Sequence, residues 1–454
     1  MFFDRLCRFV NSRLQPPYLA LVSGAIVVIS LVLAAAILLT SDQGETAFGI
    51  PPGADFSGFY VAAQIIDRGD TRSLYDVDLH DRLYHELLPH EDARTSIPYV
   101  HPPFVAGLIR PLVWISYEVA VAVWLAISAA LYSVAVIIVL KSLPLTALNA
   151  GLYVPAGECR KWNIELVLLL ALSFEPFAFE CWLGGQLSSI AFFSVAIAFA
   201  FMQRKMPFLA GVALGLCFYK PTILLLVLPM LLMGRRWKML LGMTVTGIAL
   251  VALSLVLVGW DVNVGYLDVL LSFQKRTSGG DLEIRTWKYV DLNNCLRQLL
   301  GNDSEWHKPL LVMSGLLPFG FLSQSWWRWD RLDRDQQCML WAATLTWTPL
   351  LDLYFGIYDS VLVVQSALIT AAILIRKPVS KAPLTESGLA WLLALIYAAP
   401  WFSQSLARVT GIPVYSLLLM GLGTYQCGRL IGATRVPTIQ RHEAQLTLAR
   451  ERSE

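Results

Sequence analysis

The sequence predicts an all-α, polytopic membrane protein, and its composition supports this in three ways. The 454 residues are 56% hydrophobic and 15% charged, whereas a typical soluble domain carries about 25% charged residues. Runs such as Leu19–Leu39 and Met239–Val258 contain no charge, and about 20 apolar residues cross the core of a bilayer. Aromatic residues, 11% of the chain, suit membrane interfaces. Disordered, collagen-like and purely soluble proteins are therefore excluded.

The apolar segments predict about twelve crossings within one integral membrane domain, residues 1–454. They are expected near 18–40, 118–140, 164–182, 187–203, 207–219, 221–234, 239–259, 308–325, 337–351, 360–375, 388–403 and 411–431. The first should stay uncleaved, because it is longer than the apolar region of a secretory signal. Pro207, Pro221 and Pro229 predict broken helices, which membranes tolerate where neighbours satisfy the freed backbone groups.

The direction of the chain through the membrane depends on residues 102–115. A helix over this range reaches only about 21 Å, short of a full crossing, and Arg110 and Pro111 lie in its middle. If it does not cross, most of the 35 Lys and Arg residues share the side of the N-terminus, and most of the 33 acids lie opposite. Because cytoplasmic loops are rich in Lys and Arg, we expect a re-entrant or interfacial segment and two cytoplasmic termini.

This topology leaves two long outer loops, residues 41–101 and 260–306, and a polar cytoplasmic tail, residues 435–454. Apolar residues recur at helical spacing in the first loop, which predicts amphipathic helices at the outer surface. Cys181 and Cys295 come near the same side. They are expected to pair as a disulfide or, more simply, to be small buried apolar residues.

Two residues of the first outer loop are candidates for chemistry. Asp55 follows the first span and precedes Phe-Ser-Gly-Phe-Tyr; a carboxylate partly removed from water suits general-base catalysis, although Asp is also a preferred helix N-cap. His101 precedes Pro102-Pro103 and is a candidate to bind a phosphate or a sugar hydroxyl, or to be structural.

Further candidates lie between the later spans. Lys220 is the one charged residue in the apolar run Leu209–Met233, and an ionisable residue within membrane spans is a functional candidate by default; the alternative is a side chain that extends to the interface. Gln186 follows Gly184-Gly185, and Tyr358-Asp359 precedes another span. The expected topology brings Asp55, His101, Gln186, Lys220 and Asp359 to the outer face. The sequence contains no nucleotide-binding motif, so an activated substrate would arrive on a lipid.

Several short motifs, in series, resemble glycosyltransferase family 87. They are Asp55-Phe-Ser-Gly-Phe-Tyr-Val-Ala-Ala63, Leu74-Tyr-Asp76, Tyr99-Val-His-Pro-Pro-Phe104, Pro111-Leu112, Gly185-Gln186, Lys220-Pro221 and Tyr358-Asp359. Together they cover about residues 50–365. The sequence departs from the family pattern after Thr348-Pro349. Several relatives carry a His there that this chain lacks, so the acceptor class stays open.

The resemblance implies a GT-C-type fold and an inverting glycosyltransferase in a bacterial inner membrane. Members use polyprenyl-phosphate-linked sugars, commonly mannose, on the periplasmic side. Asp55 is then the carboxylate base, and Lys220 with His101 is inferred from charge to contact the donor phosphate. Gln186, Tyr60, Tyr358 and Asp359 would bind the sugar or the acceptor.

No metal or other cofactor is expected. The expected partners are the lipid-linked donor, a glycolipid, glycan or protein acceptor, and membrane lipids, with no nucleic acid. Two other classes stay open. Broken helices with a buried Lys also fit a transporter or flippase of lipid-linked sugars, although no internal repeat is visible. A non-catalytic subunit of an envelope assembly would be favoured if Asp55 proved dispensable. Glucose and arabinofuranose remain alternative sugars.

Overall fold

The computed structural model describes residues 16–41, 53–89, 99–143, 164–278, 286–301, 304–376 and 383–434. These residues form helices joined by short turns, without a strand, and one isolated bridge links Tyr289 to Gly356. The expected all-helical class is confirmed. The tail, residues 435–454, lies outside the described residues.

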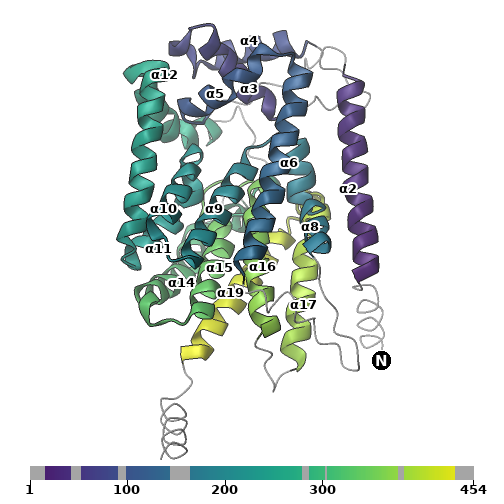
Figure 1. Cartoon of the computed structure of the whole chain (residues 1–454), viewed down its shortest axis with the longest axis vertical. Helices are drawn as coiled ribbons and strands as arrows, with labels where there is room; N and C mark the ends of the chain where they lie inside the picture. Colours follow the sequence, from purple (N-terminus) through teal and green to yellow (C-terminus); the bar gives the residue numbers. More distant parts are fainter. Residues whose placement is uncertain are drawn as a thin grey trace, which may run out of the picture.

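The elements of the first half include α2 and α6, which run along the long axis of the molecule (Figure 1). They are α2 (Pro16–Leu39), α3 (Phe56–Asp67), η1 (Thr71–Ser73), α4 (Val77–Leu87), α5 (Pro103–Ile109), η2 (Arg110–Trp114), α6 (Tyr117–Ser142), α8 (Ile164–Leu172), η3 (Pro176–Leu183), α9 (Ser188–Gln203), α10 (Pro207–Gly215), η4 (Leu216–Tyr219), η5 (Pro221–Leu224) and α11 (Val227–Met233).

The second half continues with longer helices. They are α12 (Trp237–Ser278), η6 (Thr286–Lys288), α13 (Leu292–Leu300), α14 (His307–Trp327), η7 (Trp329–Arg331), α15 (Arg334–Leu351), η8 (Ile357–Ser360), α16 (Val361–Arg376), α17 (Pro383–Ala398), α18 (Pro400–Thr410) and α19 (Val414–Thr434).

Three helical segments in the described part of the chain are long and apolar enough to cross a membrane: Pro17–Leu39, Tyr117–Ser142 and Trp237–Leu271. Two bent pairs raise the number to five if each pair is one span, and shorter apolar helices accompany them. The molecule is therefore a helical membrane protein. The number of twelve crossings stays a prediction, because length and composition alone do not decide whether the short helices cross.

The structure adds detail to two of the expected segments. The helix predicted near 388–403 is two helices, since α17 ends at Ala398 and α18 turns away by 74°. The span predicted near 239–259 ends at a kink at Gly259, and helical structure continues beyond it to Ser278. The positive φ of Gly259, 80°, belongs to a region that glycine enters without steric cost.

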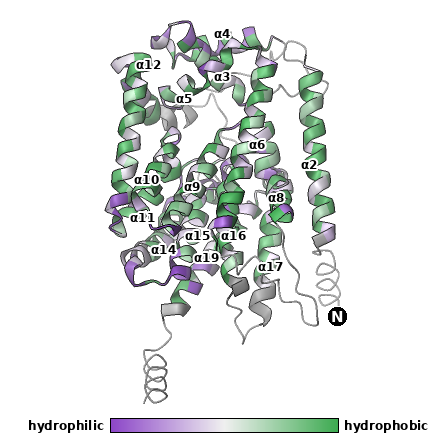
Figure 2. Ribbon diagram, in the orientation of Figure 1, coloured by the Kyte–Doolittle hydropathy of each residue, from purple (hydrophilic) through white to green (hydrophobic). Residues whose placement is uncertain are grey.

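The short elements α3, α4, α5 and η2 gather at the end of the molecule opposite the first residues of α2 (Figure 1). Hydrophilic residues concentrate there and at the opposite end, and hydrophobic residues cover the helices between them (Figure 2). Arg110 Nε donates to Asp67 Oδ1 at 2.8 Å, which joins η2 to the last turn of α3. Residues 102–115 thus pack on α3, and their interfacial placement stays a prediction.

The two bent pairs of helices meet at their breaks. Ser173, between α8 and η3, shares a 2.6 Å hydrogen bond with the hydroxyl of Tyr397, beside the break between α17 and α18. Seven residues farther along both segments, Gln404 Nε2 donates to Glu180 Oε1 at 2.6 Å. Buried polar groups require partners, so each break supplies polar partners to the other.

The cysteines that were candidates for a disulfide, Cys181 and Cys295, are both buried free thiols. The simpler expectation, that both are small buried apolar residues, is confirmed.

Candidate active site

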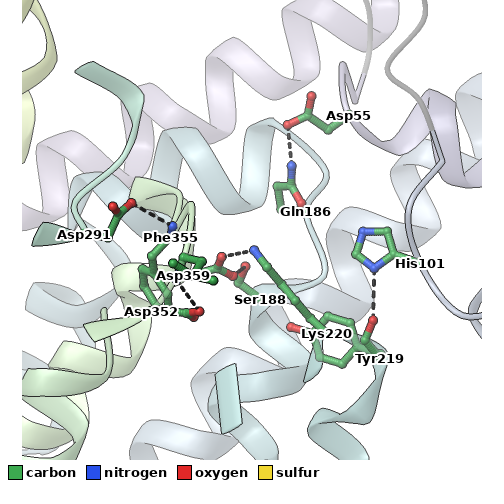
Figure 3. A network of polar contacts seen from close by, with 11 residues as sticks. Asp55, His101, Gln186, Ser188, Tyr219, Lys220, Asp291, Asp352, Phe355 and Asp359 are labelled. Carbon is green, nitrogen blue, oxygen red and sulfur yellow. Dashed lines mark hydrogen bonds and ion pairs between the residues drawn. The ribbon is translucent and has the colours of Figure 1, made fainter. Parts of the chain in front are cut away.

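Asp55 precedes the first turn of α3 and is only partly buried. Its backbone N–H donates to Gly184 O at 2.9 Å. Its carboxylate makes no capping hydrogen bond to α3; instead, Oδ2 accepts a 2.6 Å hydrogen bond from Gln186 Nε2 (Figure 3). The alternative role as a side-chain N-cap is therefore not what the structure shows. The carboxylate is oriented toward the turn between η3 and α9.

The conformation of that turn depends on glycine. Gly185 has a φ of +75°, and a Cβ at this position would lie 2.7 Å from the Cβ of Phe56. Trp124 Nε1 donates to the carbonyl of Gly185 at 3.0 Å. Because residues with a Cβ rarely adopt a positive φ, Gly185 allows the turn to approach α3 and bring Gln186 to Asp55.

Lys220, between η4 and η5, forms an ion pair with Asp359 Oδ2. Ser188 Oγ donates to the other oxygen, Asp359 Oδ1, at 2.6 Å. The side chain of Asp359 is only 1% exposed and that of Lys220 is 19% exposed. The charge of Lys220 is thus already balanced, and any phosphate that binds it competes with Asp359.

Tyr358 lies beside this ion pair. Lys220 Nζ is 4.9 Å from the centroid of its ring, within the range of a cation–π interaction. Gly356 makes the arrangement possible, since a Cβ there would lie 2.5 Å from the Tyr358 ring. Both elements of the expected Tyr358-Asp359 pair therefore contact Lys220.

His101 contacts the same region from the start of α5. Its Nδ1 lies 3.1 Å from the carbonyl oxygen of Tyr219. A carbonyl only accepts, so Nδ1 carries the proton and a neutral ring leaves Nε2 as an acceptor. Burial, with a further contribution from Lys220, lowers the pKa of His101 to about 4 against the hydrogen bond to Tyr219. A neutral imidazole adds no positive charge for a phosphate.

The comparison with known families decides the class. The sequence matches the glycosyltransferase family 87 over residues 99–353, more than half of the chain. The chain belongs to glycosyltransferase family 87. No curated protein and no solved structure matches it significantly. The resemblance seen in the short motifs is confirmed.

The family 87 match covers His101, Gln186 and Lys220 but not Asp55 or Asp359. The structure joins the two groups, because Gln186 contacts Asp55 and Lys220 contacts Asp359. The five residues that the topology assigned to one face therefore form two contacting pairs with His101 nearby (Figure 3). Their roles in this glycosyltransferase stay predictions.

Tyr60 is not brought to these pairs by any hydrogen bond. It is 4% exposed, its hydroxyl donates to Ile115 O at 3.2 Å, and its ring packs edge-on against Tyr117 with centroids 5.1 Å apart. These contacts are those of a core residue of the first outer loop. Its proposed contact with sugar or acceptor has no support in this geometry.

Asp352 adds a buried acid to the site of this family 87 member. It is 4% exposed, and Oδ1 accepts a 2.7 Å hydrogen bond from Leu353 N. Oδ2 has no hydrogen-bond partner among the described residues. Burial raises the pKa of Asp352 to about 7; the Leu353 bond and Lys220 oppose this, and Asp359 and Asp291 add to it.

Sequence reasoning missed Asp291 and Tyr289 on the second outer loop. Asp291 caps α13 and accepts a 3.1 Å hydrogen bond from Phe355 N (Figure 3). Phe355 precedes Asp359, the partner of Lys220, by four residues. The pattern Asp291-x-x-Asn294 was a readable helix start, but nothing in it indicated the contact with residue 355. Within the described ranges, no three His, Cys, Asp or Glu residues form a group suited to a metal ion.

Proposed function

We propose that this family 87 glycosyltransferase transfers a hexose, mannose first, from a polyprenyl-phosphate-linked donor to an acceptor hydroxyl on the periplasmic side of a bacterial inner membrane. The observation that carries the proposal is the Asp55–Gln186 pair. The carboxylate directly precedes α3, is not used as a helix cap, and accepts a 2.6 Å hydrogen bond from an amide of a different segment. Such support from a neighbouring side chain is what a general base requires.

The proposed reaction is a single displacement. Asp55 accepts the proton of the acceptor hydroxyl while that oxygen bonds to the anomeric carbon. The bond from this carbon to the phosphate oxygen breaks, and its electron pair leaves with the lipid phosphate. Inversion requires base and leaving group on opposite faces of the sugar, as in other inverting displacements. General-base assistance contributes about 10²–10⁴-fold.

Lys220 is proposed to stabilise the departing phosphate. It is the one cation among the residues of Figure 3, and positive charge placed where negative charge develops lowers the barrier most effectively in a site shielded from water. Asp359, whose other carboxylate oxygen accepts from Ser188, pairs with the ammonium before donor binds. The donor phosphate is therefore expected to take over part of the contact that Asp359 makes.

The test is sugar transfer by the purified full-length protein in detergent, with radiolabelled polyprenyl-phosphate-mannose and total envelope lipid. Asp55→Asn is nearly isosteric and removes the base, so transfer should fall by at least about 100-fold. The matched control is Asp78→Asn, an exposed acid in the first turn of α4 on the same loop, which should transfer at the wild-type rate. Equal activity of Asp55→Asn and the wild type would contradict the assignment of Asp55.

A transporter of lipid-linked sugars is the second candidate, and the two bent helix pairs favour it, because transporters use discontinuous helices at their binding sites. The same protein in liposomes separates the two functions. Movement of the labelled lipid across the bilayer without transfer of its sugar would favour the transporter. Transfer without such movement supports the enzyme.

A further inference from the structure

The short segment Tyr289–Asp291 is hydrogen-bonded to the turn that precedes Asp359. Val290 N donates to Phe355 O at 2.9 Å, and Phe355 N donates to Asp291 Oδ2 at 3.1 Å. Both backbone polar groups of Phe355 are thereby used, and Tyr289 pairs with Gly356 in an antiparallel bridge. We refer to these contacts of residues 289–291 with residues 355 and 356 as the clamp.

The clamp is buried and specific. Asp291 and Phe355 are each 0% exposed. The other oxygen of Asp291, Oδ1, accepts from the backbone N–H of Asn294 at 3.0 Å and so caps α13. One carboxylate therefore joins the start of α13 to the turn beyond α15. Hydrogen bonds to a buried carboxylate are strong and directional, so this side chain fixes where residue 289 lies.

The clamp holds Tyr289 beside the candidate active site. Its ring packs edge-on against Tyr354, with centroids 5.7 Å apart. Burial raises the pKa of the Tyr289 hydroxyl, Lys220 lowers it, and Asp291, Tyr354 and Asp55 raise it further. The bridge places Tyr289 opposite Gly356, two residues before Tyr358, whose ring centroid is 4.9 Å from Lys220 Nζ.

We propose that Tyr289 contacts the transferred sugar beside the Lys220–Asp359 pair, and that Asp291 is the residue that positions it. The assignment rests on the proposed function. A tyrosine offers an apolar ring face to the C–H groups of a sugar and a hydroxyl that both donates and accepts hydrogen bonds. The clamp keeps this side chain in one place before substrate arrives, as precise binding requires.

The experiment measures kcat and KM for the lipid-linked donor with the full-length protein in detergent. Tyr289→Leu removes ring and hydroxyl, and Tyr289→Phe removes the hydroxyl alone. Asp291→Ser keeps a good N-cap residue for α13 but is too short to reach Phe355 N as well. The matched control is Asp76→Ser, which alters the equivalent cap of α4, where Asp76 accepts from Leu79 N at 3.1 Å without a clamp.

We expect KM for the donor to rise at least tenfold in Tyr289→Leu and in Asp291→Ser, with the thermal midpoint of Tyr289→Leu near that of the wild type. Tyr289→Phe should show a smaller rise. The double variant should be no worse than either single variant, because Asp291 acts through Tyr289. A purely structural Asp291 would instead lower the thermal midpoint and give effects that multiply.

The outcomes distinguish this inference from the proposed function. Transfer by the wild type with an unchanged donor KM in Tyr289→Leu overturns the inference alone. Multiplying effects in the double variant overturn the positioning role of Asp291 and leave Tyr289 as a sugar contact. Absence of transfer from polyprenyl-phosphate-mannose by the wild type overturns the proposed donor, and the assignment of Tyr289 with it.

Discussion

At the scale of single residues, the amide of Gln186 determines which way the Asp55 carboxylate faces. The two residues are 131 positions apart, and their hydrogen bond is 2.6 Å long. A hydrogen bond to a charged group contributes about 1.5–3 kcal/mol. The orientation of the proposed base therefore depends on a side chain that performs no chemistry itself.

Replacing Gln186 by Leu removes this hydrogen bond while keeping most of the volume. We expect kcat for sugar transfer to fall by about tenfold to a hundredfold, because each 1.4 kcal/mol changes a rate by about tenfold. Gln203→Leu is the control, since Gln203 is also a partly buried amide but contacts Cys338 and Arg334 away from Asp55. Equal losses in both variants would mean that the effect is general destabilisation.

His101 provides a second test at this scale. Asn in its place can still donate to Tyr219 O, as Nδ1 of the imidazole does, but lacks Nε2. Burial lowers the pKa of His101 to about 4, so the ring should stay neutral from pH 5.5 to 8. The pH profile of transfer over that range should therefore have the same shape in wild type and His101→Asn. An inflection near pH 6.5 that disappears in the variant would show that His101 titrates there.

At the scale of elements, the turn between η3 and α9 decides whether the site assembles. Gly185 combines a φ of +75° with close contact to Phe56. Alanine at this position must strain the backbone and displace a packed side chain, each of which costs about 1–3 kcal/mol.

We therefore expect Gly185→Ala to lower the thermal midpoint of unfolding in detergent and to reduce transfer more than Gln186→Leu does, since the whole turn moves. The control is Gly320→Ala in α14, where an added Cβ meets nothing within 4 Å and alanine favours the helix. An unchanged midpoint in Gly185→Ala would show that the turn adapts without strain.

Apolar helices were predictable at this scale, whether long or short, and α9, Ser188–Gln203, lies within a residue of the predicted span 187–203. The ends of α2 and α6 lie within a few residues of the predicted spans near 18–40 and 118–140, because an uninterrupted apolar run leaves few alternatives. The predicted end of the span near 239–259 coincides with the kink at Gly259, whereas the helix that follows to Ser278 was not assigned in advance, since residues 260–278 mix polar and apolar side chains.

At the scale of the whole molecule, the buried acid Asp352 should make stability depend on pH. Its pKa is raised to about 7 by burial, so the folded protein keeps a proton that the unfolded chain releases near pH 4. The folded state is favoured most below pH 4. This contribution, at most about 4 kcal/mol, is lost as the pH rises from about 4 to 7.

Asp352→Asn should therefore reduce the difference between the thermal midpoints at pH 5 and pH 8, mainly by raising the midpoint at pH 8. Comparing the variant with the wild type cancels the contribution of every other titrating group. The same pH dependence in both proteins would mean that Asp352 is ionised throughout.

The candidate residues could be read from the sequence, but their pairing could not. Charge asymmetry and motif order predicted that Asp55, Gln186, Lys220 and Asp359 belong together. Which residue contacts which depends on packing between distant segments: Lys220 and Asp359 are 139 positions apart. Asp291 escaped notice for the same reason, because its local pattern reports only the helix that it caps.

The meeting of the two bent helix pairs also has a consequence for biosynthesis. Ser173 and Tyr397 are 224 positions apart, and so are Glu180 and Gln404. Polar groups left without partners inside a bilayer are costly, so the break after α8 must wait for polar contacts that the ribosome supplies only near the end of translation. A chain released before α17 and α18 are made would lack the contact of Glu180 with Gln404 and that of Ser173 with Tyr397. The hydrogen bonds around the break after α8 would thus be completed only in a chain that has been synthesised through α18.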